Sequence, residues 1–236
     1  MQFIYFVLNL GMHKILLFLF SIIIYKSGIT QVPVHKEPRH HPVFANNMIR
    51  ILNVQLPPGD TTLFHLHSTP SVFIILSKTK TGSQLMNGQS APLAPGFSVP
   101  GTIYFEDLSA PHTRIHRVWN VDTTLFHVVD VELFTKDIAF KTEPLSLPHF
   151  TLITDTSFAR VYKIDLNKGD SVSFSSSSSS FLALEISSEP AEIEKNNQHI
   201  KSVSKAGDYI WINKKEKLSI ANKNSDTISF ALLEVK

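Results

Sequence analysis

Beyond residue 30 the chain consists of short apolar or alternating runs, separated by Pro, Gly, Asn and Ser, with almost no helical periodicity. A period of two residues places successive side chains on opposite faces of a strand, so this pattern favours an all-β fold. In the first half it predicts strands at 49–56, 62–67, 72–77, 84–86, 102–108, 114–120 and 125–133. In the second half it predicts strands at 158–166, 172–174, 181–187, 209–212, 218–222 and 227–235.

The two halves contain similar signals. The turn Gly59-Asp60 precedes a strand in the first half, Gly169-Asp170 precedes one in the second, and residues 120–132 resemble residues 222–234. Alternation is lost at 135–149, where two prolines occur. A chain of 236 residues is long enough for two small domains. The sequence therefore predicts a duplicated β domain, with copies at 31–134 and 150–236 and a linker at 135–149.

The N-terminal 30 residues have a different composition. Met12-His13-Lys14 is followed by an apolar run at 15–25 and then by Lys26-Ser27-Gly28. A short basic stretch, an apolar segment and small or polar residues form the layout of a secretory signal peptide. Because residues 3–10 are also apolar and no small-x-small cleavage site is evident, a retained membrane anchor is the alternative. We expect the remainder to be exported, as a periplasmic, secreted or N-terminally anchored protein.

Charge and cysteine content exclude several classes of function. The chain contains no Cys, which excludes disulfides, thiolate metal sites and cysteine nucleophiles. Two of its 22 basic residues lie in the N-terminal segment, and the remainder carries 20 basic and 20 acidic residues. A balanced charge gives no electrostatic footprint for nucleic acid or an anionic membrane surface. Contact with a membrane is therefore expected only through the N-terminal segment.

Histidines concentrate in the first half. Of the ten that follow residue 30, eight lie between His35 and His127. In the predicted strand 62–67, His65 and His67 alternate with Leu66, so both imidazoles share one face. His116, in the predicted strand 114–120, is a third candidate. Imidazole is a good ligand for Fe, Zn, Cu and Ni, and three donors leave coordination positions open for substrate.

These residues resemble the two sequence motifs of the cupin superfamily. Gly59, followed after five residues by His65-x-His67, resembles the first motif, and Pro111-x-Thr113-x-x-His116-x-x-x-Asn120 resembles the second. The resemblance covers about residues 32–134 and implies a small jelly-roll barrel. It implies metal ligation by His65, His67 and His116, with Fe(II) favoured and Zn, Mn, Ni or Cu as alternatives. With 150–236 as a degenerate second copy, the chain is similar to the two-barrel bicupins, as a monomer or a homodimer.

The chain departs from the cupin pattern at one ligand. The usual first motif has a Glu after HxH, whereas Ser71 stands at that position here. A three-His site, as in some cupin thiol dioxygenases, is compatible with what remains. In the second half, Leu218 takes the place of His116 and no HxH follows Gly169-Asp170. We therefore expect no metal in the second copy.

The other candidates receive structural roles. We expect Asn120 to bond backbone in a turn, and His127 to lie on a polar face or at the rim of the cavity. His35, His40 and His41 lie in a Pro-rich N-terminal segment, where exposure is the default. The cavity would be lined from a set whose members depend on strand register: Phe64, Leu66, Phe73, Ile75, Phe105, Trp119 and Val128.

Two classes of function fit this sequence. The first is a mononuclear non-haem metal enzyme, dioxygenase-like, that acts on a small organic molecule in the first barrel. The second is a non-catalytic small-molecule-binding module of the cell envelope, which the missing Glu and the absence of an evident acid–base pair favour. A purely structural exported protein is a weaker alternative. No catalytic residue is assigned, because nothing pairs a nucleophile with a base.

Overall fold

The computed structural model describes residues 31–86, 93–200 and 205–236, and Val32–Lys236 form one compact unit. The predicted signal peptide or anchor at 1–30 lies outside the described residues. Among the residues that are described, no helix is long and apolar enough to cross a membrane. The described chain is almost entirely β, and its single short helical turn is η1 (Val34–Lys36).

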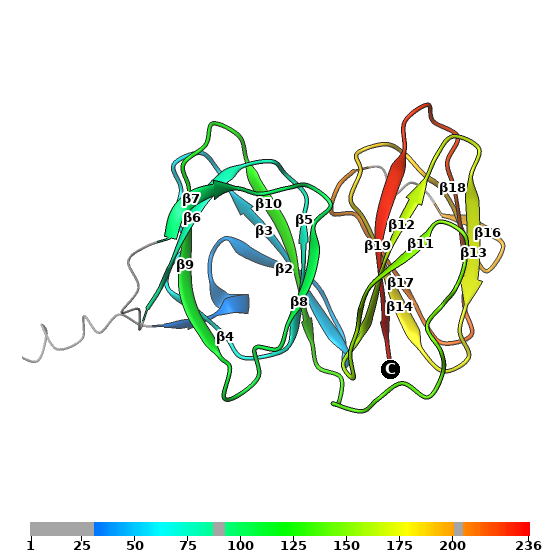
Figure 1. The fold of residues 1–236 in the computed structure, drawn as a ribbon, viewed down its shortest axis with the longest axis horizontal. Helices are drawn as coiled ribbons and strands as arrows, with labels where there is room; N and C mark the ends of the chain where they lie inside the picture. The colour runs from blue at the N-terminus through cyan, green and yellow to red at the C-terminus, as the bar shows by residue number, and fades with distance from the viewer. Residues whose placement is uncertain (1–30, 87–92, 201–204) are drawn as a thin grey trace, which may run out of the picture. The chain divides into compact units, whose positions relative to one another are not determined.

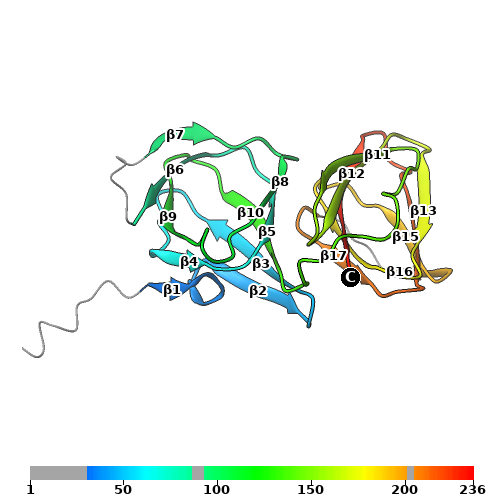
Figure 2. The same cartoon turned by 60° about the horizontal axis from the view of Figure 1, so that its bottom comes forward.

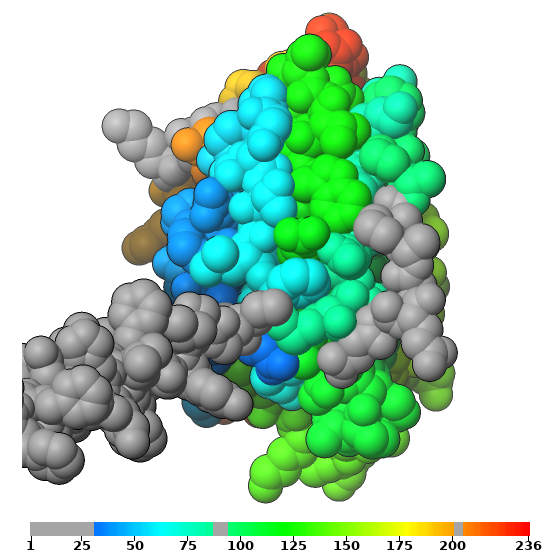
Figure 3. Space-filling model, turned by 90° about the vertical axis from the view of Figure 1, so that its left-hand side faces the viewer, coloured from blue at the N-terminus to red at the C-terminus, as the bar shows by residue number. Residues whose placement is uncertain are grey.

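Two five-stranded sheets form the first barrel (Figures 1 and 2). One has the order β1-β4-β9-β6-β7, with bounds Val32–Pro33, His65–His67, Arg114–Asn120, Lys80–Leu85 and Leu93–Phe97. The other has the order β2-β3-β10-β5-β8, with bounds His40–Ala45, Ile49–Leu56, Phe126–Leu133, Ser71–Ile75 and Ile103–Glu106. In the space-filling view, cyan and green segments that are far apart in sequence lie side by side on the surface (Figure 3).

The second barrel repeats this architecture. Its five-stranded sheet has the order β11-β12-β19-β14-β17, with bounds Phe150–Asp155, Arg160–Leu166, Ile228–Val235, Ser180–Glu185 and Tyr209–Ile212. Its four-stranded sheet has the order β13-β18-β15-β16, with bounds Ser171–Ser175, Lys217–Ala221, Glu192–Lys195 and Gln198–Ile200. The prediction of two tandem all-β barrels is confirmed. No strand is described between β10 and β11.

Alternation along β3 and β10 divides their side chains between two cores. Leu52, Val54 and Val128 point into the first barrel. Ile51 and Val131, on the opposite face, belong to a cluster that also contains side chains of β12, β14 and β19 in the second barrel. Burial on both faces explains why 128–133 and 230–235 are continuously buried, where a sheet with one solvated face would alternate. The two barrels therefore share a hydrophobic core.

The same hydrogen bonds close the turn in both barrels. The Gly59 amide donates to the Asn120 carbonyl, and the Gly169 amide donates to the Asn222 carbonyl, at 3.1 and 2.9 Å. Both glycines have a positive φ, of 77° and 87°, which a residue with a Cβ adopts only with strain. The side-chain amide of Asn120 donates to the Leu56 carbonyl, as that of Asn222 does to the Leu166 carbonyl. The predicted turn role of Asn120 is confirmed, and the halves are structural repeats.

Several strands lie outside the predicted set. They are β1, β2, β7, β11, β15 and β16, all of them at or next to a sheet edge. Proline weakened the sequence signal in β2 and β7, which contain Pro42 and Pro95. Pro42 is tolerated because β2 is an edge strand and its register with β3 shifts between Pro42 and Phe44. The predicted strand 62–67 begins only at His65.

Candidate metal centre

Strands β4 and β9 bring the three predicted histidines together. The strands are antiparallel, with His65 directly opposite His116. His65 and His67 point into the barrel and are 0% and 2% exposed, whereas Leu66 points the other way and is only partly buried. The ring centroids of His65 and His67 are 5.0 Å apart, and those of His116 lie 4.6 and 5.1 Å from them.

A fourth imidazole joins this cluster. His40, on β2, is 6% exposed, and its ring centroid lies 4.5 Å from that of His65. One ring nitrogen from each of His40, His65 and His67 lies within 4.8 Å of the others. The expectation that His40 is exposed is therefore wrong, because β2 pairs with β3 and directs this side chain inward. No spacing signal in the sequence connects His40 to His65. His41, its neighbour, is exposed, in accordance with the alternation of the strand.

The outward-facing Nδ1 atoms of two of these rings are held by oxygen acceptors. His65 donates through Nδ1 to the Leu63 carbonyl at 2.9 Å, which leaves its Nε2 with a free lone pair. The Nδ1 of His40 lies 2.7 Å from Glu37 Oε2. The Nδ1 of His67 faces Asp130 Oδ2 at the longer distance of 3.5 Å. An acceptor behind a histidine that fixes its tautomer and orientation is characteristic of metal-ligating imidazoles.

The inward-facing Nε2 atoms differ in their partners: that of His65 has none among the described residues, whereas those of His67 and His116 share a hydrogen bond. His65 Nε2 is buried and has no hydrogen-bond partner in the described structure. The Nε2 atoms of His67 and His116 lie 3.1 Å apart. Two nitrogens bound at right angles to one ion, each about 2.1 Å from it, would also lie about 3.0 Å apart. The unpaired nitrogen and this spacing fit a divalent metal ion.

Burial keeps the imidazoles neutral, which is the form that binds metal. It lowers the pKa of His65 to about 4 and that of His116 to about 3, with further lowering from neighbouring histidines. Burial, His116 and His65 together place the pKa of His67 well below its usual range. All three rings are therefore available as ligands at neutral pH.

Two buried carboxyl groups border the cluster. Glu37 accepts hydrogen bonds from His40 and from the backbone amides of Arg39 and Leu63. Burial alone would raise the pKa of Glu37, but these hydrogen bonds outweigh it and leave the pKa below its usual value. Asp130 is buried, and burial, assisted by Glu132, raises its pKa strongly despite a lowering contribution from the nearby Ser71 hydroxyl. Neither carboxyl group was singled out from the sequence.

The cluster opens into a small apolar cavity of about 80 Å³. Phe73, Ile75 and Val128, from the predicted lining set, border it, whereas Phe64, Leu66, Phe105 and Trp119 do not. Strand register explains why Phe105 does not line the cavity. Phe105 on β8 lies opposite Val72 on β5, and the side chains of both point away from the cavity. Tyr104 also lines the cavity, stacks on Phe73 at 5.1 Å and remains partly exposed. Burial, assisted by Glu106, raises the pKa of Tyr104 to about 12, so its hydroxyl stays protonated.

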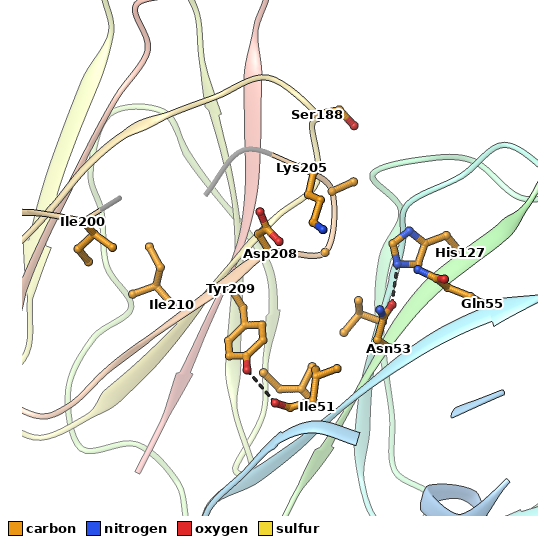
Figure 4. Close-up of a pocket in the computed structure, with 14 residues that line it drawn as sticks. Ile51, Asn53, Gln55, His127, Ser188, Ile200, Lys205, Asp208, Tyr209 and Ile210 are labelled. Carbon is orange, nitrogen blue, oxygen red and sulfur yellow. Dashed lines mark hydrogen bonds between the residues drawn. The ribbon is translucent and has the colours of Figure 1, made fainter. Parts of the chain in front are cut away.

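Neither Ser71 nor His127 joins the cluster of imidazoles. Ser71 is buried, and its hydroxyl donates to the Thr69 carbonyl at 3.4 Å, so it does not replace the missing Glu ligand. His127 faces outward and shares a 2.7 Å hydrogen bond with Asn53 Oδ1 (Figure 4). His127 and Asn53 line a separate cleft of about 650 Å³, together with Lys205 of the second barrel. His127 is therefore no ligand of this centre.

In the second barrel, apolar side chains fill the equivalent place. Leu218 stands four residues before Asn222, as His116 does before Asn120, and Leu218 lies opposite Phe174. Phe174 contacts Phe150 and Phe181 edge to face, at centroid distances of 5.6 and 5.4 Å. These aromatic rings occupy the space around Leu218.

No protein-family model matches the sequence, and no curated protein matches it. Solved structures do match the fold. AerE from Microcystis aeruginosa is 11% identical with a TM-score of 0.57, and the match covers 85% of this chain and 98% of AerE. Salicylate 1,2-dioxygenase from Pseudaminobacter salicylatoxidans is 8% identical with a TM-score of 0.58, over 84% of this chain and 77% of the enzyme.

A third similar structure carries the family name. The cupin 2 conserved barrel domain protein from Leptotrichia buccalis is 8% identical with a TM-score of 0.53, and the match covers 89% of this chain and all of that protein. At such identities the likeness establishes the fold alone. Together with the HxH and His-x-x-x-Asn motifs on β4 and β9, it identifies this chain as a protein of the cupin fold, with two tandem barrels and a histidine cluster in the first.

Proposed function

We propose that the first barrel binds a divalent metal ion through His65, His67 and His116. The observation that carries this proposal is the buried, unpaired Nε2 of His65 among imidazoles that face one another. A lone pair buried without a partner costs free energy unless something binds it. A cation would satisfy this nitrogen and would also bind the Nε2 atoms that His67 and His116 direct at each other.

We further propose that the protein is a mononuclear non-haem metal enzyme, dioxygenase-like, that acts on a small organic molecule. The structural likeness to a salicylate 1,2-dioxygenase supports this class, as do the facing imidazoles of His65, His67 and His116, which as three ligands would leave coordination positions open. We favour Fe(II), which would supply the redox chemistry that dioxygen requires; Zn, Mn, Ni and Cu are the alternatives.

The residues of the chain would orient the substrate and exclude water. Phe73, Ile75 and Val128 make the cavity apolar, and Tyr104, which also lines it, carries a protonated hydroxyl that can donate a hydrogen bond. The volume of about 80 Å³ is far below the roughly 300 Å³ of ordinary ligand pockets. A substrate larger than a few atoms would therefore need the partly exposed Tyr104 to move.

The second candidate is a non-catalytic module that binds a small ligand. The small volume of the cavity favours this candidate. In both cases we propose an exported or N-terminally anchored protein that acts as a monomer or a homodimer. N-terminal sequencing of the mature protein tests export, because cleavage near residue 30 is expected.

Elemental analysis of the untagged full-length chain tests metal binding. We expect close to one equivalent of a divalent metal, lost in the double variant His65→Ala/His67→Ala. The matched control is His41→Ala/His112→Ala, which removes two exposed histidines and should retain the metal. Absence of metal from the unaltered protein after reconstitution would overturn the proposal. Oxygen uptake with small acids and thiols then separates enzyme from binding module.

A further inference from the structure

The segment before β3 is tied to the histidine cluster at several points. We refer to residues 34–40 as the N-terminal strap. Val34 at its start is buried in the core of the first barrel. Arg39 near its end forms a bidentate pair with Asp60, at 2.9 and 2.7 Å. The strap therefore has a fixed position relative to the Gly59-Asp60 turn that leads into β4.

Glu37 is the centre of this attachment. Its carboxylate accepts hydrogen bonds from the Arg39 amide at 2.7 Å and from the Leu63 amide at 3.1 Å. Leu63 in turn provides the carbonyl that holds His65. A carboxylate that accepts two backbone amides is stabilised in its ionised form. Glu37 can therefore only accept from His40 Nδ1, and the proton of a neutral His40 ring must reside there.

In a neutral His40 ring this arrangement places the lone pair on Nε2. His40 then matches His65, whose Nδ1 also donates outward, and both rings present Nε2 to the cluster. The two ring centroids are 4.5 Å apart, which is the shortest centroid distance given among the four histidines. Ser71, at the position of the usual Glu ligand, bonds elsewhere.

We propose that His40 is a further protein ligand of the metal, in place of the missing Glu, and that Glu37 is its positioning residue. The inference rests on the proposed metal centre and extends it to four imidazoles. All four protein ligands would then be neutral, so the ion would keep its full charge. Such a site favours an anionic exogenous ligand over a neutral one of equal size.

X-ray absorption spectroscopy of the unaltered full chain loaded with Co(II) tests the ligand number directly. We expect scattering from four imidazoles, and three would overturn the inference while leaving the metal centre intact. This measurement needs no variant, so it decides the question even if a substitution in the strap prevents folding. A chain that binds no Co(II) overturns the proposed metal centre itself.

Chelator competition with Co(II) tests the two residues separately. We expect Glu37→Gln to weaken Co(II) affinity by about 10-fold to 100-fold, because removing a partner behind a ligand has effects of this size. His40→Ala, which removes the proposed ligand itself, should weaken the affinity at least as much. The visible spectrum of Co(II) should change in His40→Ala, which loss of a purely structural contact would not cause. Unchanged affinity and spectrum in both variants would overturn the inference.

Matched controls separate ligation from general destabilisation. His41→Ala alters the exposed neighbour on the same strand, and Glu234→Gln alters a buried, hydrogen-bonded carboxylate in the second barrel. Both should keep the affinity and spectrum of the unaltered protein. Azide should bind to the Co(II) protein and shift its spectrum, and Glu37→Asp should recover part of the affinity lost in Glu37→Gln.

Discussion

The Nε2 atoms of His67 and His116 lie 3.1 Å apart, although 49 residues separate them in the chain. At most one proton fits between two such nitrogens, so at least one lone pair is directed at the other ring. Antiparallel pairing of β4 with β9 imposes this proximity, since His65 is opposite His116 and His67 is opposite Arg114. The two nitrogens are held at a spacing suited to a shared ion.

Replacing His116 by the residue of the second barrel should remove the metal and keep the fold. For His116→Leu without metal, we expect a free energy of unfolding within about 1 kcal/mol of that of the original protein. The reason is that the second barrel accommodates Leu218 at the equivalent place. The original protein should gain about 2.7 kcal/mol from an ion at 100 times its Kd. For a chain of this size that raises Tm by roughly 5 to 10 °C. Differential scanning calorimetry with and without Zn²⁺ measures the stability of the ion-free protein and the rise in Tm on binding. A rise in Tm for His116→Leu equal to that of the original protein would contradict the assignment of His116 as a ligand.

The equivalent asparagines should contribute equally to stability. Asn120 and Asn222 each donate from the side-chain amide to two backbone carbonyls, at 2.8 to 2.9 Å. Asn120→Ala and Asn222→Ala should each lower the free energy of unfolding by about 2 kcal/mol, because buried carbonyls lose their donors. Urea denaturation measures this. A loss of metal affinity in Asn120→Ala without a loss of stability would instead indicate a role at the site.

Stability should fall as pH rises through the titration of Glu185. Burial, assisted by Asp208 and Glu189, raises the pKa of Glu185 from 4.5 to about 7. Between these values the folded protein keeps a proton that the unfolded chain releases, so unfolding becomes easier with rising pH. Above pH 7 the cost is complete and amounts to roughly 3 kcal/mol at most.

The substitution Glu185→Gln should therefore stabilise the protein at pH 8 and leave it nearly unchanged at pH 4. Urea denaturation across this range measures the effect. Glu194→Gln, at an exposed position of β15, is the control and should not alter the pH profile. An equal gain for Glu185→Gln at both pH values would show that Glu185 does not titrate in this window.

The core shared by the barrels should make them unfold together. Leu233 is fully buried and belongs to the cluster that includes Ile51 and Val131 of the first barrel. Leu233→Ala should cost about 2 to 5 kcal/mol. A single urea transition by circular dichroism and by tryptophan fluorescence is expected, since Trp119 lies in the first barrel and Trp211 in the second. Two separate transitions would show that the barrels fold independently.

Local sequence patterns determined the β architecture and the first part of the site. Alternation placed strands at Ile49–Leu56 and Arg114–Asn120 with the bounds that the structure has. The same period of two placed His65 and His67 on one face, because strand geometry fixes that relation without any partner. The repeated Gly-Asp turns and the two asparagines indicated the duplication, since both signals lie within a few residues of the turns that they build.

Only the tertiary structure decided that His40 and Glu37 lie beside the histidine cluster. Proline in β2 weakened its strand signal, and the pairing of β2 with β3 that turns His40 inward depends on the register of distant residues. The sequence of β10 also does not show what covers the outward face of this strand, which in the structure packs against the second barrel. A one-residue shift exchanges the two faces of a strand, so the local pattern shows which residues share a face. Which residues pack against that face depends on contacts between segments that are far apart in the sequence.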